Sequence, residues 1–172
     1  KLFDQYQEIP ATLTYFSRGC PFNCAFCTYN VPNYLDRRSP AQISEELQYL
    51  KTDYGIQGVL VKDEVAIPTK KKESEEMLGA IGSADIVWRG QTTTLATFDQ
   101  LKMASESGCL ELAVGVETVD DNVMAIVGKK WQKENGIRKF IENSKRVGIK
   151  VKICLILGLP GEPRDIVRRT IK

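Results

Sequence analysis

Apolar segments alternate along the chain with amphipathic ones, a pattern that predicts strands that each lead into a helix. The expected strands are rich in β-branched and other apolar residues and cover residues 11–16, 58–61, 86–89, 110–116 and 151–157. The last of them is almost continuously apolar, which is typical of a strand with both faces covered. Strands that alternate with helices over short connections favour an α/β fold with a parallel sheet and right-handed crossovers.

Amphipathic segments supply the helices between these strands. The clearest begins after Ser39, a good N-cap residue, has Pro40 at its first position and ends at Gly55. The other expected helices cover residues 73–81, 98–107, a longer region that ends at Gly148, and 163–172. Because the last helix has barely begun after the last strand, the sheet keeps an unfinished edge. We therefore expect the core of a larger fold, truncated before its last strand–helix unit.

Composition is that of an ordinary globular domain. The 172 residues are 42% hydrophobic and 27% charged, enough for one well-packed domain. A formal net charge of +2 is too small an imbalance to indicate nucleic acid or an anionic membrane as a partner. No apolar run approaches the length that spans a bilayer, so we expect a soluble, cytoplasmic protein.

Three cysteines lie close together just after the first expected strand. Cys20, Cys24 and Cys27 are spaced C-x3-C-x2-C, and the chain contains no histidine. Thiolates select soft metals, and a compact loop can deliver three of them to one iron–sulfur cluster, which leaves one iron without a protein ligand. An iron with an open position can bind a substrate or a small cofactor, so the loop is interpreted as catalytic.

Two other sites stay open for the same cysteines. A structural zinc site needs a fourth ligand, which Cys109 or Cys154 would have to supply. A non-catalytic electron-transfer module with the same cluster would also need four cysteine ligands. We expect instead that Cys109 and Cys154 are buried in the core, where free cysteine behaves as a small hydrophobe, and that Trp88 and Trp131 are packing residues.

Polar residues gather at the expected carboxyl ends of the strands, where parallel α/β folds have their active sites. Asp63 and Glu64 follow the second strand, Arg89 and Gln91 the third, Glu117 the fourth, and residues 158–162 the fifth. Each has an ordinary explanation alone, since a carboxylate after a strand often caps a helix and Gly-Leu-Pro-Gly-Glu is a good turn. Their common location is the stronger signal and favours one binding site.

The cysteine loop, with Phe26 immediately before the third cysteine, resembles the signature of the radical S-adenosylmethionine superfamily. Residues 37–40, 115–118 and 158–162 resemble the branch that includes cobalamin-dependent members and methylthiotransferases. The resemblance implies a radical S-adenosylmethionine core domain over residues 1–172. It also implies a partial TIM-type (β/α)6 barrel, of which about five parallel strand–helix units are present.

The resemblance further implies the chemistry of the site. Three thiolates hold a [4Fe–4S] cluster, and the amino and carboxylate groups of S-adenosylmethionine chelate the remaining iron. Reductive cleavage then gives a 5′-deoxyadenosyl radical that abstracts hydrogen from a substrate. An electron donor such as a flavodoxin or ferredoxin is implied, and cobalamin is a further cofactor where a domain outside this chain carries it. Methyl transfer, sulfur insertion, rearrangement and ring closure all stay open as outcomes.

Individual roles also follow from the resemblance. Phe26 is expected to contact adenine through its backbone, and the glycines of the last motif to let the backbone approach the adenosine closely. The remaining expected contacts are Asp63 or Glu64 with the methionine ammonium, Glu117 with the ribose hydroxyls or the ammonium, Arg89 with the carboxylate or in a structural salt bridge, and Gly158 and Gly161 with the adenosine.

Overall fold

The structure, a computed structural model, describes residues 9–28 and 34–171, so residues 1–8, 29–33 and Lys172 of the expected core domain lie outside the described residues. The strands are β1 (Ala11–Thr14), β2 (Ser17–Gly19), β3 (Leu35–Arg37), β4 (Gly58–Val61), β5 (Val87–Thr92), β6 (Cys109–Glu117) and β7 (Lys150–Leu155). The helices are α1 (Pro40–Tyr54), α2 (Lys71–Ser83), α3 (Phe98–Glu106), α4 (Asp121–Ile126), α5 (Glu134–Arg146) and α6 (Ile166–Ile171).

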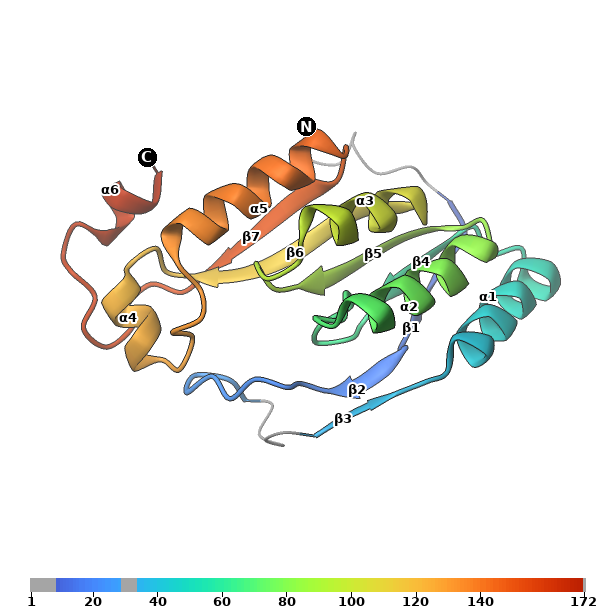
Figure 1. Ribbon diagram of the computed structural model, residues 1–172, viewed down its shortest axis with the longest axis horizontal. Coiled ribbons are helices and arrows are strands. Elements are labelled where there is room, and N and C mark those ends of the chain that lie inside the picture. The colour runs from blue at the N-terminus through green and yellow to red at the C-terminus, as the bar shows by residue number, and fades with distance from the viewer. Residues whose placement is uncertain (1–8, 29–33, 172) are drawn as a thin grey trace.

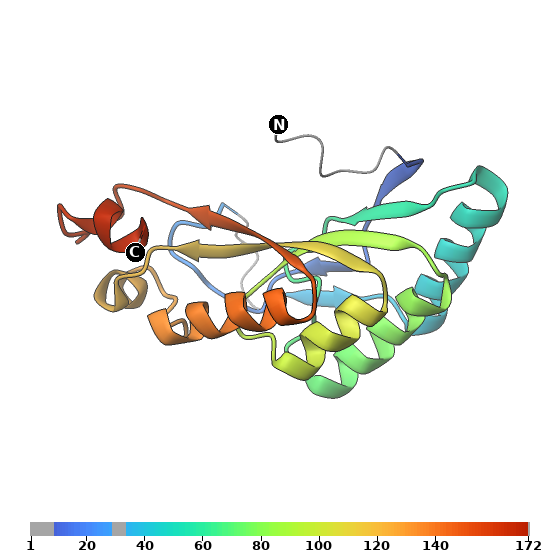
Figure 2. The ribbon, with the colours of Figure 1, turned by 90° about the horizontal axis from the view of Figure 1, so that it is seen from above.

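Five strands form one parallel sheet in the order β1-β4-β5-β6-β7. Helices α1, α2, α3 and α5 lie side by side and cover one face of this sheet (Figures 1 and 2). The short helices α4 and α6 lie beyond the carboxyl ends of β6 and β7 (Figure 1). The expected α/β fold with a parallel sheet is therefore confirmed. Within the described residues, no helix has both the length and the apolar character that crossing a membrane requires.

Local signals account for the best-predicted helix. The Ser39 side chain accepts from the backbone N–H of Gln42, whose side chain in turn accepts from the Ser39 N–H, so the two form a capping box before α1. Gly55 ends the helix in the left-handed conformation, as expected. Ile43 and Leu47 are buried from α1.

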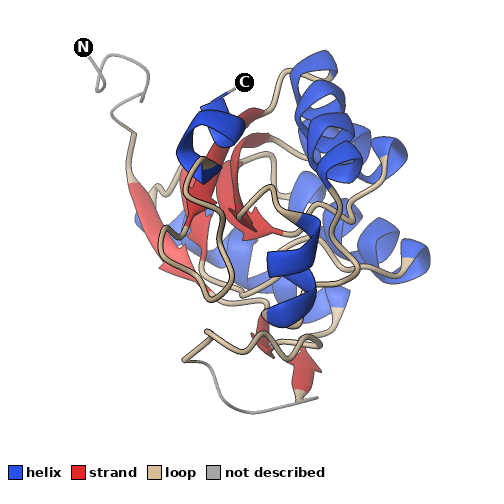
Figure 3. Cartoon of the chain, turned by 90° about the vertical axis from the view of Figure 1, so that its left-hand side faces the viewer, coloured by secondary structure: helices blue, strands red, loops and turns tan. Residues whose placement is uncertain are grey.

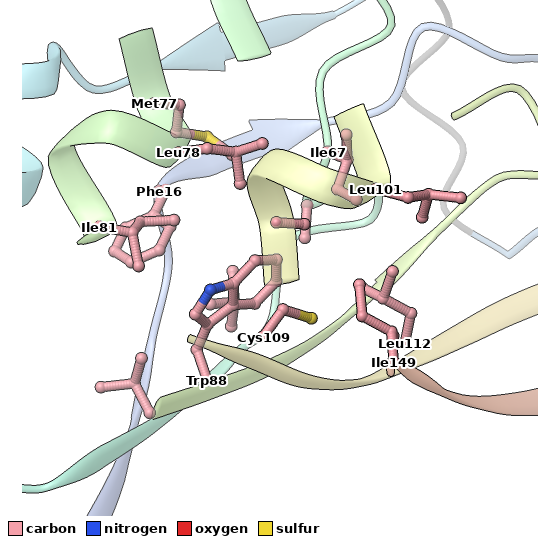
Figure 4. Packing of buried hydrophobic residues seen from close by; sticks show 14 of the residues in the cluster. Phe16, Ile67, Met77, Leu78, Ile81, Trp88, Leu101, Cys109, Leu112 and Ile149 are labelled. Carbon is pink, nitrogen blue, oxygen red and sulfur yellow. The ribbon is translucent and has the colours of Figure 1, made fainter. Parts of the chain in front are cut away.

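The main core lies between the sheet and the helices that cover it. Figure 4 shows Trp88 and Leu112 of the sheet close to Leu78 and Ile81 of α2 and to Leu101 of α3. All five side chains are at most 2% exposed. Burial of this size is the dominant favourable contribution to folding, and it fixes the strand ends that carry the site.

The first expected strand is shorter than predicted. β1 ends at Thr14, because the N–H of Phe16 donates to the side chain of Asp63 instead of continuing the ladder. The chain then enters β2, which pairs antiparallel with β3 and carries the cysteine loop away from the main sheet (Figure 1).

The third expected strand, by contrast, is longer than predicted. The strand was expected to cover residues 86–89, but β5 continues to Thr92. The reason is that Gly90 and Gln91 continue the parallel pairing with β6. Arg89 therefore lies within the strand, so the expectation that it follows the strand is wrong.

The last strand differs from the expectation in its exposure. β7 pairs with β6 at the end of the sheet order, and Ile153 and Leu155 are 44% and 45% exposed, so coverage of both faces is wrong for the described residues. Cys154, which lies between them, is exposed and not in the core as predicted. Cys109 and Trp88 are both buried, so those two predictions are confirmed.

Candidate active site

One pocket of about 230 Å³ lies at the carboxyl ends of the strands. Its lining comes from the cysteine loop (Cys20, Phe22, Cys24, Phe26, Cys27), the segment after β4 (Glu64, Val65), the end of β5 (Gln91, Thr92, Thr93), β6 (Ala113, Gly115, Glu117), the turn after α4 (Lys129, Trp131) and β7 (Cys154). Figure 3 looks at this end of the sheet, with the loops and α4 toward the viewer. A larger pocket of about 350 Å³ lies at the amino-terminal ends of the strands and includes none of the cysteines.

The three loop cysteines all face this pocket. Cys20 and Cys24 are half-buried and Cys27 is exposed. The loop closes on itself through the Cys27 N–H, which donates to the Cys24 carbonyl at 3.0 Å. Burial raises the pKa of the Cys20 and Cys24 thiols, while the Lys129 ammonium acts on both in the opposite direction. Since thiols must lose their protons to bind a metal, metal binding here releases protons and is pH-dependent.

The donor set fits an iron–sulfur cubane better than one metal ion. A closed zinc site places four ligands around a single ion at about 2.3 Å for sulfur. In residues 9–28 and 34–171, no group of three or more cysteine, aspartate, glutamate or histidine side chains is arranged to hold one ion. A cubane instead binds each thiolate to a different iron, so three thiolates that line one pocket suit it. Cys109 is buried in the helix-covered core and does not line the pocket.

A buried ion pair between Glu117 and Lys129 forms part of the pocket wall. Glu117 ends β6 with a φ of +63° after an irregular step in the ladder, which turns its side chain into the pocket. The Lys129 ammonium lies 3.3 Å from Glu117 Oε1 and donates to the Gly115 carbonyl at 2.6 Å. Lys129 was not among the predicted site residues, because a lysine in a turn carries no local sign that it will be buried against β6.

Two carboxylates expected at the site, those of Glu64 and Asp63, lie in different environments in the structure. Glu64 lines the pocket, and its Oε2 accepts from Gln91 at 3.2 Å. Asp63 does not line it, because its side chain is 1% exposed and accepts from the Phe16 N–H at 2.8 Å and from the Ser17 hydroxyl. Burial raises the pKa of Asp63, and those hydrogen bonds oppose the rise. The structure therefore places Asp63 in the β1–β2 junction.

Arg89 also lies away from the cysteines. It lines the larger pocket at the opposite ends of the strands, and its Nη1 lies 3.9 Å from Glu111 Oε1. Of the two roles expected for Arg89, its position on β5 matches the structural salt bridge.

The glycine motif after β7, residues 158–162, lies outside the lining of the pocket. Gly158 and Gly161 both have φ near +80° to +90°, and neither lines the pocket. The Glu162 carboxylate accepts from the N–H groups of Gly158 and Leu159 at 2.7 and 3.2 Å, which holds the turn together. Leu159 is buried in a small cluster with Val123 and Val127, and Phe26 of the cysteine loop packs against this cluster.

A parallel α/β sheet with three cysteines and a buried ion pair around one strand-end pocket defines the core of an iron–sulfur enzyme. The chain belongs to the radical SAM superfamily, whose family model matches residues 14–172. Members of this family use a [4Fe–4S] cluster and S-adenosylmethionine. The family membership expected from the cysteine loop is confirmed.

Relatives of known name are methyltransferases and a cyclase. An uncharacterized methyltransferase of Pyrococcus horikoshii is 29% identical over 98% of this chain, and a cytidylyl-2-hydroxyethylphosphonate methyltransferase of Streptomyces wedmorensis is 27% identical over 85%. An anaerobic magnesium-protoporphyrin IX monomethyl ester cyclase of Cereibacter sphaeroides is 24% identical over 91%. The chain spans only 38%, 28% and 26% of the lengths of these relatives.

Solved structures share the fold. The radical S-adenosylmethionine methyltransferase TsrM from Kitasatospora setae superposes with a TM-score of 0.84 at 14% identity, over 94% of this chain and 33% of that one. The cobalamin-dependent radical enzyme OxsB superposes with a TM-score of 0.73 at 15% identity, over 84% of this chain and 23% of that one. The expected partial barrel, similar to the cobalamin-dependent branch, is confirmed at the level of the fold.

Proposed function

We propose that this chain is a catalytic core in which Cys20, Cys24 and Cys27 hold a [4Fe–4S] cluster whose open iron faces S-adenosylmethionine. When bound, the cluster and S-adenosylmethionine supply a 5′-deoxyadenosyl radical that abstracts hydrogen from a substrate. The observation that carries the proposal is the convergence of the three cysteines with Glu64, Glu117 and Lys129 on one pocket.

The pocket residues match the charged groups of S-adenosylmethionine. Glu117 and Glu64 supply carboxylates for its ammonium and ribose hydroxyls, since a cation bound in a poorly hydrated site needs a partner. We assign Lys129, rather than Arg89, to the methionine carboxylate, because only Lys129 of the two lines the cysteine pocket. The buried ammonium already lies at the pocket wall, so binding requires little reorganisation there.

Phe26 is the residue whose backbone is expected to contact adenine. Phe26 lines the pocket and packs against the small cluster that includes Leu159, from the turn that contains Gly158 and Gly161. We propose that this turn fixes Phe26, so that the backbone of the loop can contact adenine. Asp63 acts by holding the β1–β2 junction from which the loop starts.

We propose methyl transfer as the reaction of the whole protein, supported by the names of relatives that match most of this chain. Cobalamin is then a second cofactor, carried by a part of the protein outside this chain, as the fold shared with OxsB and TsrM favours. The electron comes from a flavodoxin or ferredoxin. A reducing cytoplasm suits the free thiols and the cluster they bind.

Anaerobic reconstitution with iron and sulfide tests the cluster site. We expect an electron paramagnetic resonance signal from the reduced protein that changes when S-adenosylmethionine is added, which shows binding at the open iron. Cys24→Ala should lose this signal, and normal iron content in Cys24→Ala would refute the proposal.

Cys154→Ala is the matched control, because Cys154 lines the same pocket from β7 and lies outside the loop. It should keep both the iron and the response to S-adenosylmethionine. Loss of the cluster in Cys154→Ala, with no response in the parent protein, would instead identify a four-cysteine electron-transfer module. Stoichiometric zinc without visible absorption would identify a structural zinc site.

A further inference from the structure

We infer that Gly128, in the turn between α4 and α5, positions the cysteine loop and thereby tunes the cluster that the loop holds. The inference rests on the proposed cluster site. Gly128 touches no cofactor group in this interpretation and acts through the backbone of the loop. The turn of residues 127–131, here called the seat, contacts the loop at three successive places.

The first contact is a hydrogen bond between backbones that are far apart in sequence. The N–H of Ala25 donates to the carbonyl of Val127 at 3.0 Å. Ala25 lies between Cys24 and Cys27, and Val127 is the C-cap residue of α4. Carbonyls at the end of a helix have no partner within it, so this one is available to the loop.

Gly128 makes the second contact by its lack of a side chain. A Cβ on Gly128 would lie 2.8 Å from the carbonyl oxygen of Asn23, closer than real Cβ atoms approach, and 3.7 Å from the Cα of Cys24. Gly128 also has a φ of +80°, a conformation that favours glycine. The loop can approach the turn this closely only because residue 128 is glycine.

Aromatic packing makes the third contact. The rings of Phe22 and Trp131 stack with centroids 4.6 Å apart, and Lys129 lies over the Trp131 ring at 5.3 Å. Phe26 packs against the small cluster that contains Val127. Figure 1 shows α4 next to the loop that follows β2, although about a hundred residues separate them in the chain.

The position of the loop matters for the chemistry of the cluster. The reduction potential of an iron–sulfur cluster depends on hydrogen bonds near its sulfurs and on solvent exposure. A seat that fixes the backbone around Cys24 fixes both. Moving Asn23 and Cys24 by a few tenths of an ångström would therefore shift the potential while the three thiolates remain.

Gly128→Ala and Gly148→Ala form a matched pair for the test. Gly148 has nearly the same φ, +79°, but nothing lies within 4 Å of a Cβ built on it. Both substitutions place alanine in the left-handed region, and only Gly128→Ala adds the collision with the loop. Any difference between the two variants therefore reports the contact itself.

Two readouts are measured on each variant. In the cluster-free protein, hydrogen exchange of the peptide that contains Ala25 should be roughly fivefold faster in Gly128→Ala, as for the loss of one ordinary hydrogen bond. In the reconstituted protein, the reduction potential or the resonance spectrum should shift in Gly128→Ala, with or without loss of iron. Gly148→Ala should match the parent protein in both readouts, and a Gly128→Ala that behaves as Gly148→Ala would overturn the inference.

Further variants separate the possible failures. If hydrogen exchange also becomes faster in α1 of Gly128→Ala, the substitution has disrupted the fold. The inference is then tested with the pair Trp131→Ala and Trp131→Phe. Trp131→Ala should shift the resonance spectrum, whereas Trp131→Phe, which keeps an aromatic ring at this position, should give the spectrum of the parent protein. Unshifted spectra in both variants would refute the positioning role of the seat. If Cys24→Ala retains its cluster, the proposed site itself has failed. If Cys24→Ala loses the cluster but Gly128→Ala equals Gly148→Ala, only the positioning role has failed.

Discussion

Replacing Lys129 by methionine tests whether the buried ion pair is both structural and functional. Methionine is one atom shorter than lysine, keeps an unbranched apolar side chain and lacks the ammonium. The Lys129 and Glu117 side chains are 6% and 12% exposed, and their charged atoms lie 3.3 Å apart. Two unit charges at that separation attract by about 5 kcal/mol at an effective dielectric constant of about 20, before desolvation is subtracted.

The net effect on stability follows from what the substitution leaves behind. Lys129→Met leaves the carboxylate of Glu117 buried without its cation, and the Gly115 carbonyl loses its donor. Removing one partner of a buried pair costs about 3–5 kcal/mol, and we expect about 3 kcal/mol here because Glu117 borders the pocket. The double variant with Glu117→Gln should recover part of this, about 1–3 kcal/mol, as coupling energy.

Urea unfolding of the metal-free protein, followed by circular dichroism, measures these free energies. Lys130→Met is the control, since the neighbouring Lys130 is exposed and should change the free energy of unfolding by less than about 0.5 kcal/mol. Binding of S-adenosylmethionine to the loaded protein should weaken roughly 10- to 100-fold in Lys129→Met and should not return in the double variant. A Lys129→Met that unfolds like Lys130→Met would refute the reasoning about the pair.

Two further predictions concern carboxylates that support the site. Because burial raises the pKa of Asp63, the folded state holds its proton more tightly than the unfolded chain, so its contribution to stability should fall as pH rises from the ordinary aspartate value, about 3.9, through the raised pKa. Asp63→Asn should remove that slope in urea unfolding at a series of pH values, and an unchanged slope contradicts the assignment. Asp120 caps α4 by accepting from the N–H groups of Asn122 and Val123 and pairs with Arg169 at 2.7 Å. Asp120→Ala should cost about 1–2 kcal/mol in thermal or urea unfolding, whereas Asp120→Asn should retain most of the cap; equal losses in the two variants would show that the ion pair dominates.

Features that depend on neighbouring residues can be predicted from the sequence. The capping box at Ser39, the glycine at the end of α1 and the C-x3-C-x2-C spacing each depend on residues a few positions apart, so the chain alone specifies them. The parallel arrangement of the strands followed from their alternation with helices. Apolar composition also identified Cys109 and Trp88 as core residues.

Features that depend on the pairing of distant segments cannot be predicted in this way. β2 and β3 are three residues each, and their pairing joins segments on either side of the cysteine loop, so no run of apolar residues marks them. The polar sequence around Arg89 suggested a strand end, yet the pairing with β6 extends β5 to Thr92. Lys129 lines the pocket because its ammonium contacts Gly115 and Glu117 of β6, and Cys154 because β7 pairs with β6, which neither residue type nor spacing indicates.

The division between local and distant parts also bears on how the site assembles. The three cysteines lie within one short loop, so their closeness to one another depends only on nearby residues. The ion pair, Glu64 and the seat around Gly128 come from later segments and reach the pocket only when β4, β6 and α4 are in place. A response of the cluster to S-adenosylmethionine therefore reports the assembled pocket. A variant that breaks α4 should lose that response.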